Sequence, residues 1–316
     1  MTSSRITRYF RNSKKMIIAA ILVLLSFSSG ACDICGCSIN GYHFGILPQF
    51  RKNIVGVSYS YRSFASQHLI SETLYILGNR STEYYNTIDV WGRVQVGKRL
   101  QLYAFVPVNH FIQREKGVSN KTNGLGDITL AANYVLLNTT PQRDKKIKQT
   151  LLAGGGIKLP AGRFNDAKAG EELNPSMNTG TGSVDYLAQV IYQFRYGRTG
   201  LNTDVNYRIN GANKKEFRFG NRLTTAAKVF YWKDIGKKTT LLPNTGLLYE
   251  QAAKDRHHGE VQEFSGGHVL FFVAGLETYR GPLNIGATYN HPLTQNLSKN
   301  LVTLNNQFSV HANIIF

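Results

Sequence analysis

Three cysteines lie within six consecutive positions near the N-terminus, and the 316-residue chain contains no others. The stretch CDICGC places Cys32, Cys35 and Cys37 in a Cys-x-x-Cys-x-Cys pattern, and His43 follows six residues later. Thiolates at this spacing can bind a thiophilic ion such as Cu(I) or Zn(II). In an oxidising compartment two of the thiols can instead form a disulfide, and the odd count then leaves one thiol over.

Lipidation of Cys32 is a third interpretation of the same stretch. The preceding Ser29-Gly30-Ala31 lacks the branched residue that usually stands three positions before a lipidated cysteine. Haem attachment is excluded, because Gly36 and not His follows Cys35. The residue types therefore leave a disulfide, a metal site and a lipid anchor open.

Residues 1–31 have the three parts of a secretory signal peptide. Five basic residues precede an apolar run from Met16 to Phe27, and small residues follow at 29–31. The apolar run is too short to cross a bilayer as a helix. Removing 1–31 lowers the net charge from +18 to +13, since this segment carries five basic and no acidic side chains. We expect an exported, basic chain that meets lipopolysaccharide rather than nucleic acid.

From residue 53 onward, apolar side chains recur at every second position, the period of a strand. In IVGVSYSYR, Val55 and Val57 share one face while Ser58 and Arg62 share the other. About twelve such segments follow, each near the ten residues that a tilted membrane strand needs. They are predicted at 53–64, 83–97, 100–112, 125–137, 149–160, 183–195, 200–210, 221–232, 239–250, 268–279, 282–290 and 303–316.

Long polar connections alternate with short ones along these segments. Long connections are expected at 65–82, 113–124, 161–182, 211–220, 251–267 and 291–302, and the segment 138–148 is longer than the scheme requires. Long outer loops and short periplasmic turns are typical of outer-membrane barrels. We therefore predict an all-β fold, with 53–316 forming a transmembrane antiparallel β-barrel of about 12 strands in the outer membrane of a Gram-negative bacterium.

The face opposite the apolar residues carries a charge in nearly every predicted strand. Such charges suit a wet or plugged lumen, where acids and bases can pair, whereas a soluble sandwich would bury both inner faces as apolar surface. Asp127 and Asp185 are expected near one rim, where they either bind basic residues of a folded-in loop or select cations. The candidates for the lumen or its selectivity are Asp127, Asp185, Arg62, Arg93, Arg208 and Lys228.

Three stretches resemble the family of outer-membrane transporters of the phenol-degradation meta pathway, which is related loosely to fatty acid and aromatic hydrocarbon channels. They are GLGDITLAANYVLL (124–137), LLAGGGIKLPAGRFND (151–166) and GTGSVDYLAQVIYQFRYG (180–197). The resemblance implies a barrel that passes small, often apolar molecules. The ending on Phe316 resembles the signal that the barrel-assembly machinery reads.

The resemblance to fatty acid channels also implies that residues 32–52, the Cys-containing N-terminal segment, could fold into the lumen as a hatch. The chain shows no Gly-x-Ser-x-Gly turn, P-loop or zinc-protease helix, so an enzyme is not expected. We predict a channel for small apolar, aromatic or metal-linked solutes without energy coupling of its own. The alternative is a structural or surface-binding barrel with a redox or metal-binding N-terminus.

Overall fold

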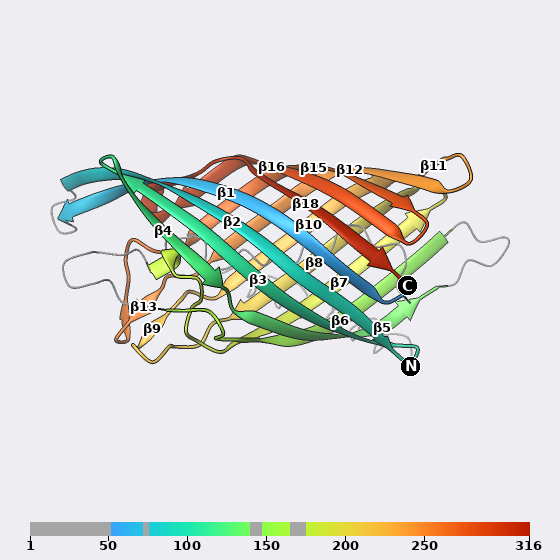
Figure 1. Ribbon diagram of the computed structural model, residues 1–316, viewed down its shortest axis with the longest axis horizontal. Coiled ribbons are helices and arrows are strands. Elements are labelled where there is room, and N and C mark those ends of the chain that lie inside the picture. The colour runs from blue at the N-terminus through green and yellow to red at the C-terminus, as the bar shows by residue number, and fades with distance from the viewer. Residues whose placement is uncertain (1–51, 72–75, 140–146, 165–174) are drawn as a thin grey trace, which may run out of the picture. The chain divides into compact units, whose positions relative to one another are not determined.

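The computed structural model describes residues 52–71, 76–139, 147–164 and 175–316, which form an antiparallel β-barrel (Figure 1). Twelve strands each pair with two neighbours, and the first pairs with the last, so the sheet closes on itself. In barrel order they are β1 (Ile54–Ser71), β2 (Ile76–Val96), β3 (Leu100–Glu115), β5 (Ile128–Asn138), β6 (Ile147–Leu159), β7 (Asp185–Tyr196), β8 (Thr199–Ile209), β10 (Arg222–Tyr231), β12 (Thr239–Ala252), β15 (Gly267–Arg280), β16 (Leu283–Leu297) and β18 (Gln307–Ile315). The all-β, twelve-stranded prediction is confirmed.

Shorter elements extend the wall or cover its end. β4 (Val118–Leu125) pairs with β3, β17 (Val302–Leu304) pairs with β1 and β16, and β11 (Lys233–Ile235) pairs with β12. β9 (Phe217–Arg218), β13 (Arg256–His257) and β14 (Glu260–Val261) form a separate small sheet. The described residues also form two single-turn helices, η1 (Pro175–Met177) and η2 (Ser298–Asn300). Within the described ranges, no helix has the length and apolarity of a membrane span.

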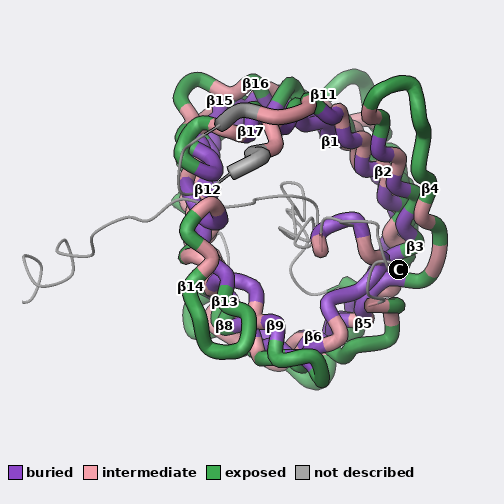
Figure 2. The backbone as a smooth tube through the Cα atoms, turned by 90° about the vertical axis from the view of Figure 1, so that its left-hand side faces the viewer, coloured by how far each residue is buried: buried purple, intermediate pink, exposed green. Residues whose placement is uncertain are grey.

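Successive side chains of a strand point to opposite faces of the sheet, so the inner and outer faces of the barrel wall carry different residues. Ile54 is 1% exposed and points inward, whereas its neighbour Val55 is 52% exposed and points outward. The same alternation of buried and exposed residues runs along the strands in Figure 2. The exposed face is largely apolar, as a surface against lipid must be, and the buried face surrounds the lumen.

Several of the expected polar connections are partly strands. β1 and β2 continue into the segment 65–82, and β3 and β4 form a hairpin across most of 113–124. The polarity of these residues suggested loops, but backbone hydrogen bonds in a hairpin do not require apolar side chains. The last predicted segment, 303–316, is also divided, because β17 ends at Leu304 and β18 begins at Gln307.

Candidate functional site

The long connections lie at one end of the barrel, the long-loop end, and the short turns lie at the other, the short-turn end. At the long-loop end, one lysine contacts two aspartates. Lys158 Nζ lies 2.7 Å from Asp127 Oδ2 and 2.7 Å from Asp185 Oδ2, and all three side chains are buried. Lys158 stands at the end of β6, Asp185 begins β7, and Asp127 immediately precedes β5. Removing the lysine would leave two buried carboxylates without a cation, which is costly.

The two carboxylates also fasten the connection between β6 and β7. Asp127 Oδ1 accepts a hydrogen bond from the Gly162 backbone N–H (3.0 Å), and Asp127 Oδ2 accepts from the Thr181 N–H (2.8 Å). Asp185 Oδ1 accepts from Ser183 Oγ at 2.8 Å and from the backbone N–H of residue 211 at 3.1 Å. All of these groups except residue 211 come from the three stretches that carry the family resemblance, so these distant motifs converge on one cluster.

Two glycines allow this connection to fold back on itself. Gly180 donates its N–H to the Arg163 carbonyl at 3.0 Å. A Cβ on Gly162 would lie 2.7 Å from the Cα of Gly180, and a Cβ on Gly180 would lie 2.7 Å from the Cα of Gly162. No side chain fits between these backbones, which is why glycine is needed at both positions.

Aromatic rings connect three of the outer loops to one another. Phe217 packs against Phe219 with ring centroids 4.8 Å apart, and Phe164 from the β6–β7 connection contacts both rings. His257 of β13 adds a ring contact to Phe217 at 5.8 Å. In the part of the chain that the structure describes, no three His, Cys, Asp or Glu side chains come together as metal ligands.

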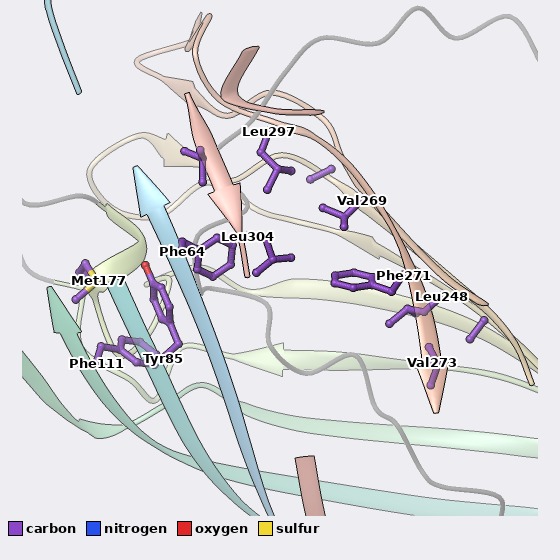
Figure 3. Close-up of a cluster of buried hydrophobic side chains, with 13 residues drawn as sticks. Phe64, Tyr85, Phe111, Met177, Leu248, Val269, Phe271, Val273, Leu297 and Leu304 are labelled. Atoms are coloured by element: carbon purple, nitrogen blue, oxygen red, sulfur yellow. The ribbon is translucent and has the colours of Figure 1, made fainter. Parts of the chain in front are cut away.

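A cluster of buried apolar side chains fills part of the lumen beneath this end (Figure 3). Phe64, Tyr85 and Phe111 project from β1, β2 and β3, and Met177 of η1 packs against them. The remaining members are Ala226, Leu248, Ala252, Val269, Phe271, Val273, Leu297, Val302 and Leu304. The cluster brings together inward-facing residues of strands that are far apart in the barrel.

An ion pair crosses the lumen at this level. Arg62 Nη2 of β1 lies 3.2 Å from Glu250 Oε1 of β12, although β15, β16 and β18 separate these strands in the wall. Both side chains are under 10% exposed. A pair that links distant strands through the interior narrows the free path between them.

A second buried apolar cluster lies toward the short-turn end. Its largest members are Trp91, Tyr103, Phe105, Phe230 and Tyr279, joined by Ile54, Leu242 and Ile315. Trp91 and Phe105 stack with centroids 6.0 Å apart, and Tyr103 stacks on Phe105 at 6.3 Å. Aromatic rings therefore face the lumen at both levels of the barrel.

Glycine 154 permits a polar bridge across one strand of the wall. Asn133 of β5 and Gln189 of β7 stand on either side of Gly154, and Gln189 Nε2 donates to Asn133 Oδ1 at 2.5 Å. A Cβ on Gly154 would overlap the Asn133 side chain. The space left by the missing side chain at Gly154 thus serves a side-chain hydrogen bond.

All six lumen candidates from the sequence point inward and are buried, but they do not form one site. Asp127 and Asp185 meet at Lys158, whereas Arg62 bonds Glu250. Arg93 Nη2 donates to the Lys52 carbonyl at 2.8 Å. The other two, Arg208 and Lys228, lie on β8 and β10. Their roles in solute passage remain predictions.

Sequence reasoning missed Lys158 as the partner of the two aspartates. The alternation that placed Asp127 inward also places Lys158 inward, on the same side of β6 as Gly154 and Gly156, so a signal was present. The two expected explanations for the aspartates were a basic residue on a loop or a cation filter. In the structure the cation is Lys158, which belongs to strand β6 of the wall and not to a loop.

Several predictions concern residues outside the described ranges. These are the signal peptide at 1–31, the N-terminal segment up to residue 51, and the metal candidates Cys32, Cys35, Cys37 and His43. The disulfide, copper or zinc, and lipid interpretations of the cysteines stay predictions.

The protein is a closed twelve-stranded barrel with an apolar outer face. It is therefore an integral protein of the outer membrane of Gram-negative bacteria. The chain belongs to the family described as "Putative MetA-pathway of phenol degradation", whose model matches residues 78–295, more than half of its length. This confirms the resemblance drawn from the three sequence stretches. The curated proteins gave no match.

Solved structures support the fold. The COG4313 outer membrane channel from Pseudomonas putida F1 is 15% identical, with a TM-score of 0.60, over 86% of this chain and 100% of that one. The translocator domain of the autotransporter NalP from Neisseria meningitidis is 12% identical with a TM-score of 0.38, covering 98% and 97% of the two chains. The NanC porin is 12% identical with a TM-score of 0.40, covering 82% and 98%. The last two likenesses are too distant to carry an argument.

Proposed function

We propose that this protein is a passive channel that carries small apolar or aromatic molecules across the outer membrane, with no energy coupling and no catalytic activity of its own. The observation that carries the proposal is the pair of buried apolar clusters facing the lumen. A general porin has a polar, water-filled interior, whereas aromatic and aliphatic side chains offer an apolar solute a favourable surface.

The arrangement of the lumen suits stepwise passage of such a solute. Phe64, Phe111 and Phe271 are at most 1% exposed, so a ring-shaped molecule contacts them only as this packing opens, and it then meets Trp91 and Phe105 nearer the periplasm. The ion pair between Arg62 and Glu250 crosses the outer level, so the solute must pass beside it or displace it. The family description, which refers to phenol degradation, is consistent with an aromatic cargo.

Uptake of an apolar aromatic dye by intact cells tests the proposal. 1-N-phenylnaphthylamine fluoresces when it reaches phospholipid, and an intact outer membrane delays it. Cells of a Gram-negative host that produce the barrel should take up the dye several times faster than cells without it. Phe271→Asp should abolish this gain, because a carboxylate in the apolar cluster repels an apolar solute, and Phe271→Ala should increase it by widening the path.

The matched control is Val261→Asp, which makes the same kind of change on the exposed strand β14 of the long-loop end. It should leave dye uptake unchanged. Vesicle swelling with a neutral sugar provides the opposing measurement. Fast sugar flux together with unchanged dye uptake would show a water-filled porin instead and would refute the proposal.

A further inference from the structure

Among the described residues, seven exposed cations lie in the turns at the short-turn end of the barrel. They are Lys98, Arg99, Arg198, Lys233, Lys237, Lys238 and Arg280. Among the described residues of the turns at 97–99, 196–199, 233–239 and 280–282, the single acidic side chain is Asp234. Within the described chain, none of the seven cations takes part in a salt bridge.

The Asp234 side chain forms its hydrogen bonds within its own hairpin. Trp232 Nε1 and Thr240 Oγ1 donate hydrogen bonds to its Oδ1 at 2.9 and 2.8 Å. These two hydrogen bonds, together with the nearby Arg198 and Arg195, lower the pKa of the Asp234 carboxyl below its ordinary value. Among the described residues of these turns, one acidic side chain therefore faces seven cations, and the excess positive charge needs an external counterion.

The long-loop end treats its cations differently. Lys254 Nζ and Lys299 Nζ lie 2.6 and 3.4 Å from Glu263 Oε2. An acidic residue of the long-loop end thus neutralises part of the charge there.

The seven cations of the short turns lie where the apolar band of the wall ends. Val96, Tyr196 and Tyr231 are exposed on the outward face within two residues of Lys98, Arg198 and Lys233. Arg99 Nη1 also donates to the hydroxyl of the outward-facing Tyr134 at 3.4 Å. Tyrosines of this kind mark the membrane–water interface, so cations just beyond them stand at the level of the lipid headgroups.

We propose that this ring of seven cations, the turn rim, binds the phosphates of anionic phospholipids in the periplasmic leaflet. Each cation contributes by attraction to a negatively charged headgroup surface, and the contributions of several residues add together. The interaction fixes the depth of the barrel in the membrane and recruits acidic lipids around its periplasmic end. It is independent of what passes through the lumen.

Lipid retention by the purified full-length protein tests the proposal. The protein in detergent is mixed with equal amounts of phosphatidylglycerol and phosphatidylcholine, and bound lipids are counted by native mass spectrometry. We expect a preference of roughly tenfold for phosphatidylglycerol. The rim variant Arg198→Gln/Lys233→Gln/Lys237→Gln/Lys238→Gln should lose this preference. The control Lys116→Gln/Lys121→Gln/Lys214→Gln/Arg256→Gln removes four exposed cations at the other end and should keep it.

Two outcomes would overturn the proposal. A rim variant that retains the preference would show that these cations do not contact the lipid. An equal loss in both variants would show an effect of net charge alone. Retention of the heat-modifiable band on gels identifies folded protein, and if the rim variant fails to fold, salt provides a second test on the unmodified protein. Raising NaCl from about 50 mM to about 500 mM should reduce the preference, and an unchanged preference would contradict the proposal.

Discussion

The two ends of the barrel handle charge in opposite ways. At the long-loop end, Asp127, Lys158 and Asp185 form a buried cluster that fastens the β6–β7 connection, and exposed Lys254 and Lys299 share Glu263. Among the described residues of the short-turn end, seven exposed cations stand against one acidic side chain. The buried cluster satisfies its charges inside the protein, whereas the cations of the turn rim are left for the surroundings.

This difference follows from the length of the connections. A long connection can fold back and bring its backbone N–H groups to a buried carboxylate, as residues 162 and 181 do for Asp127. A turn of two or three residues cannot reach the interior, so its side chains remain in contact with solvent and lipid. The outer end is therefore built to hold a fixed shape, and the short-turn end to meet a surface.

Loss of the cation at the outer end should have the largest effect. Lys158→Met leaves Asp127 and Asp185 buried and adjacent without a positive partner, which should lower the free energy of unfolding by about 3–5 kcal/mol. The urea midpoint of the heat-modifiable band measures this loss. Lys121→Met, at an exposed position of the same end, should leave the midpoint within error. A tolerated Lys158→Met would mean that the two carboxylates do not depend on the lysine.

Breaking the pair that crosses the lumen should cost somewhat less. Arg62→Met leaves Glu250 buried and unpaired, and we expect a loss of about 3 kcal/mol. In the double variant Arg62→Met/Glu250→Met, the charge is removed from both partners, so most of that stability should return. Urea unfolding of the two single variants and the double variant gives the coupling energy. Additive losses would show that the two side chains do not interact.

Filling the gap at Gly154 should have a smaller effect. Gly154→Ala displaces Asn133 from Gln189 and leaves buried amide groups unsatisfied, at about 1–3 kcal/mol. Gly92→Ala is the control, because a Cβ there meets nothing closer than the Ile54 carbonyl at 3.5 Å. The urea midpoint should fall for the first variant and not for the second. Equal midpoints would mean that the wall accommodates a methyl group at both positions.

The smallest effect on stability is expected from a substitution of Asp234 at the short-turn end. The folded-state pKa of Asp234 is depressed, so its stabilising contribution is present above the unfolded pKa, near 4, and is lost as the pH falls through the folded value. Because Asp234 is exposed, Asp234→Asn should cost well under about 1 kcal/mol at pH 7. The difference between the two proteins in melting temperature should vanish once the pH has fallen below the depressed folded-state pKa. A difference that persists at low pH would assign it to packing instead.

Much of the fold could be predicted because a strand has a fixed period. Val55 and Arg62 fall on opposite faces whatever the register, so the apolar outside and the charged inside followed directly from the sequence. The twelve strands and the inward burial of Asp127, Asp185, Arg93 and Lys228 followed from the same rule. Hairpin extensions such as the β3–β4 pair were missed, because polar hairpins and polar loops have similar compositions.

The sequence by itself determined which residues face the lumen, since the alternation of side chains is a local property of each strand. Only the tertiary structure decided which of them meet. Lys158 pairs with Asp127 and Asp185 because β6 lies between β5 and β7. Strands that follow one another in the sequence are usually neighbours in the sheet, so this pairing could have been anticipated. Arg62 pairs with Glu250 because closure of the barrel brings β1 and β12 into reach across the lumen, and no local pattern records that distance.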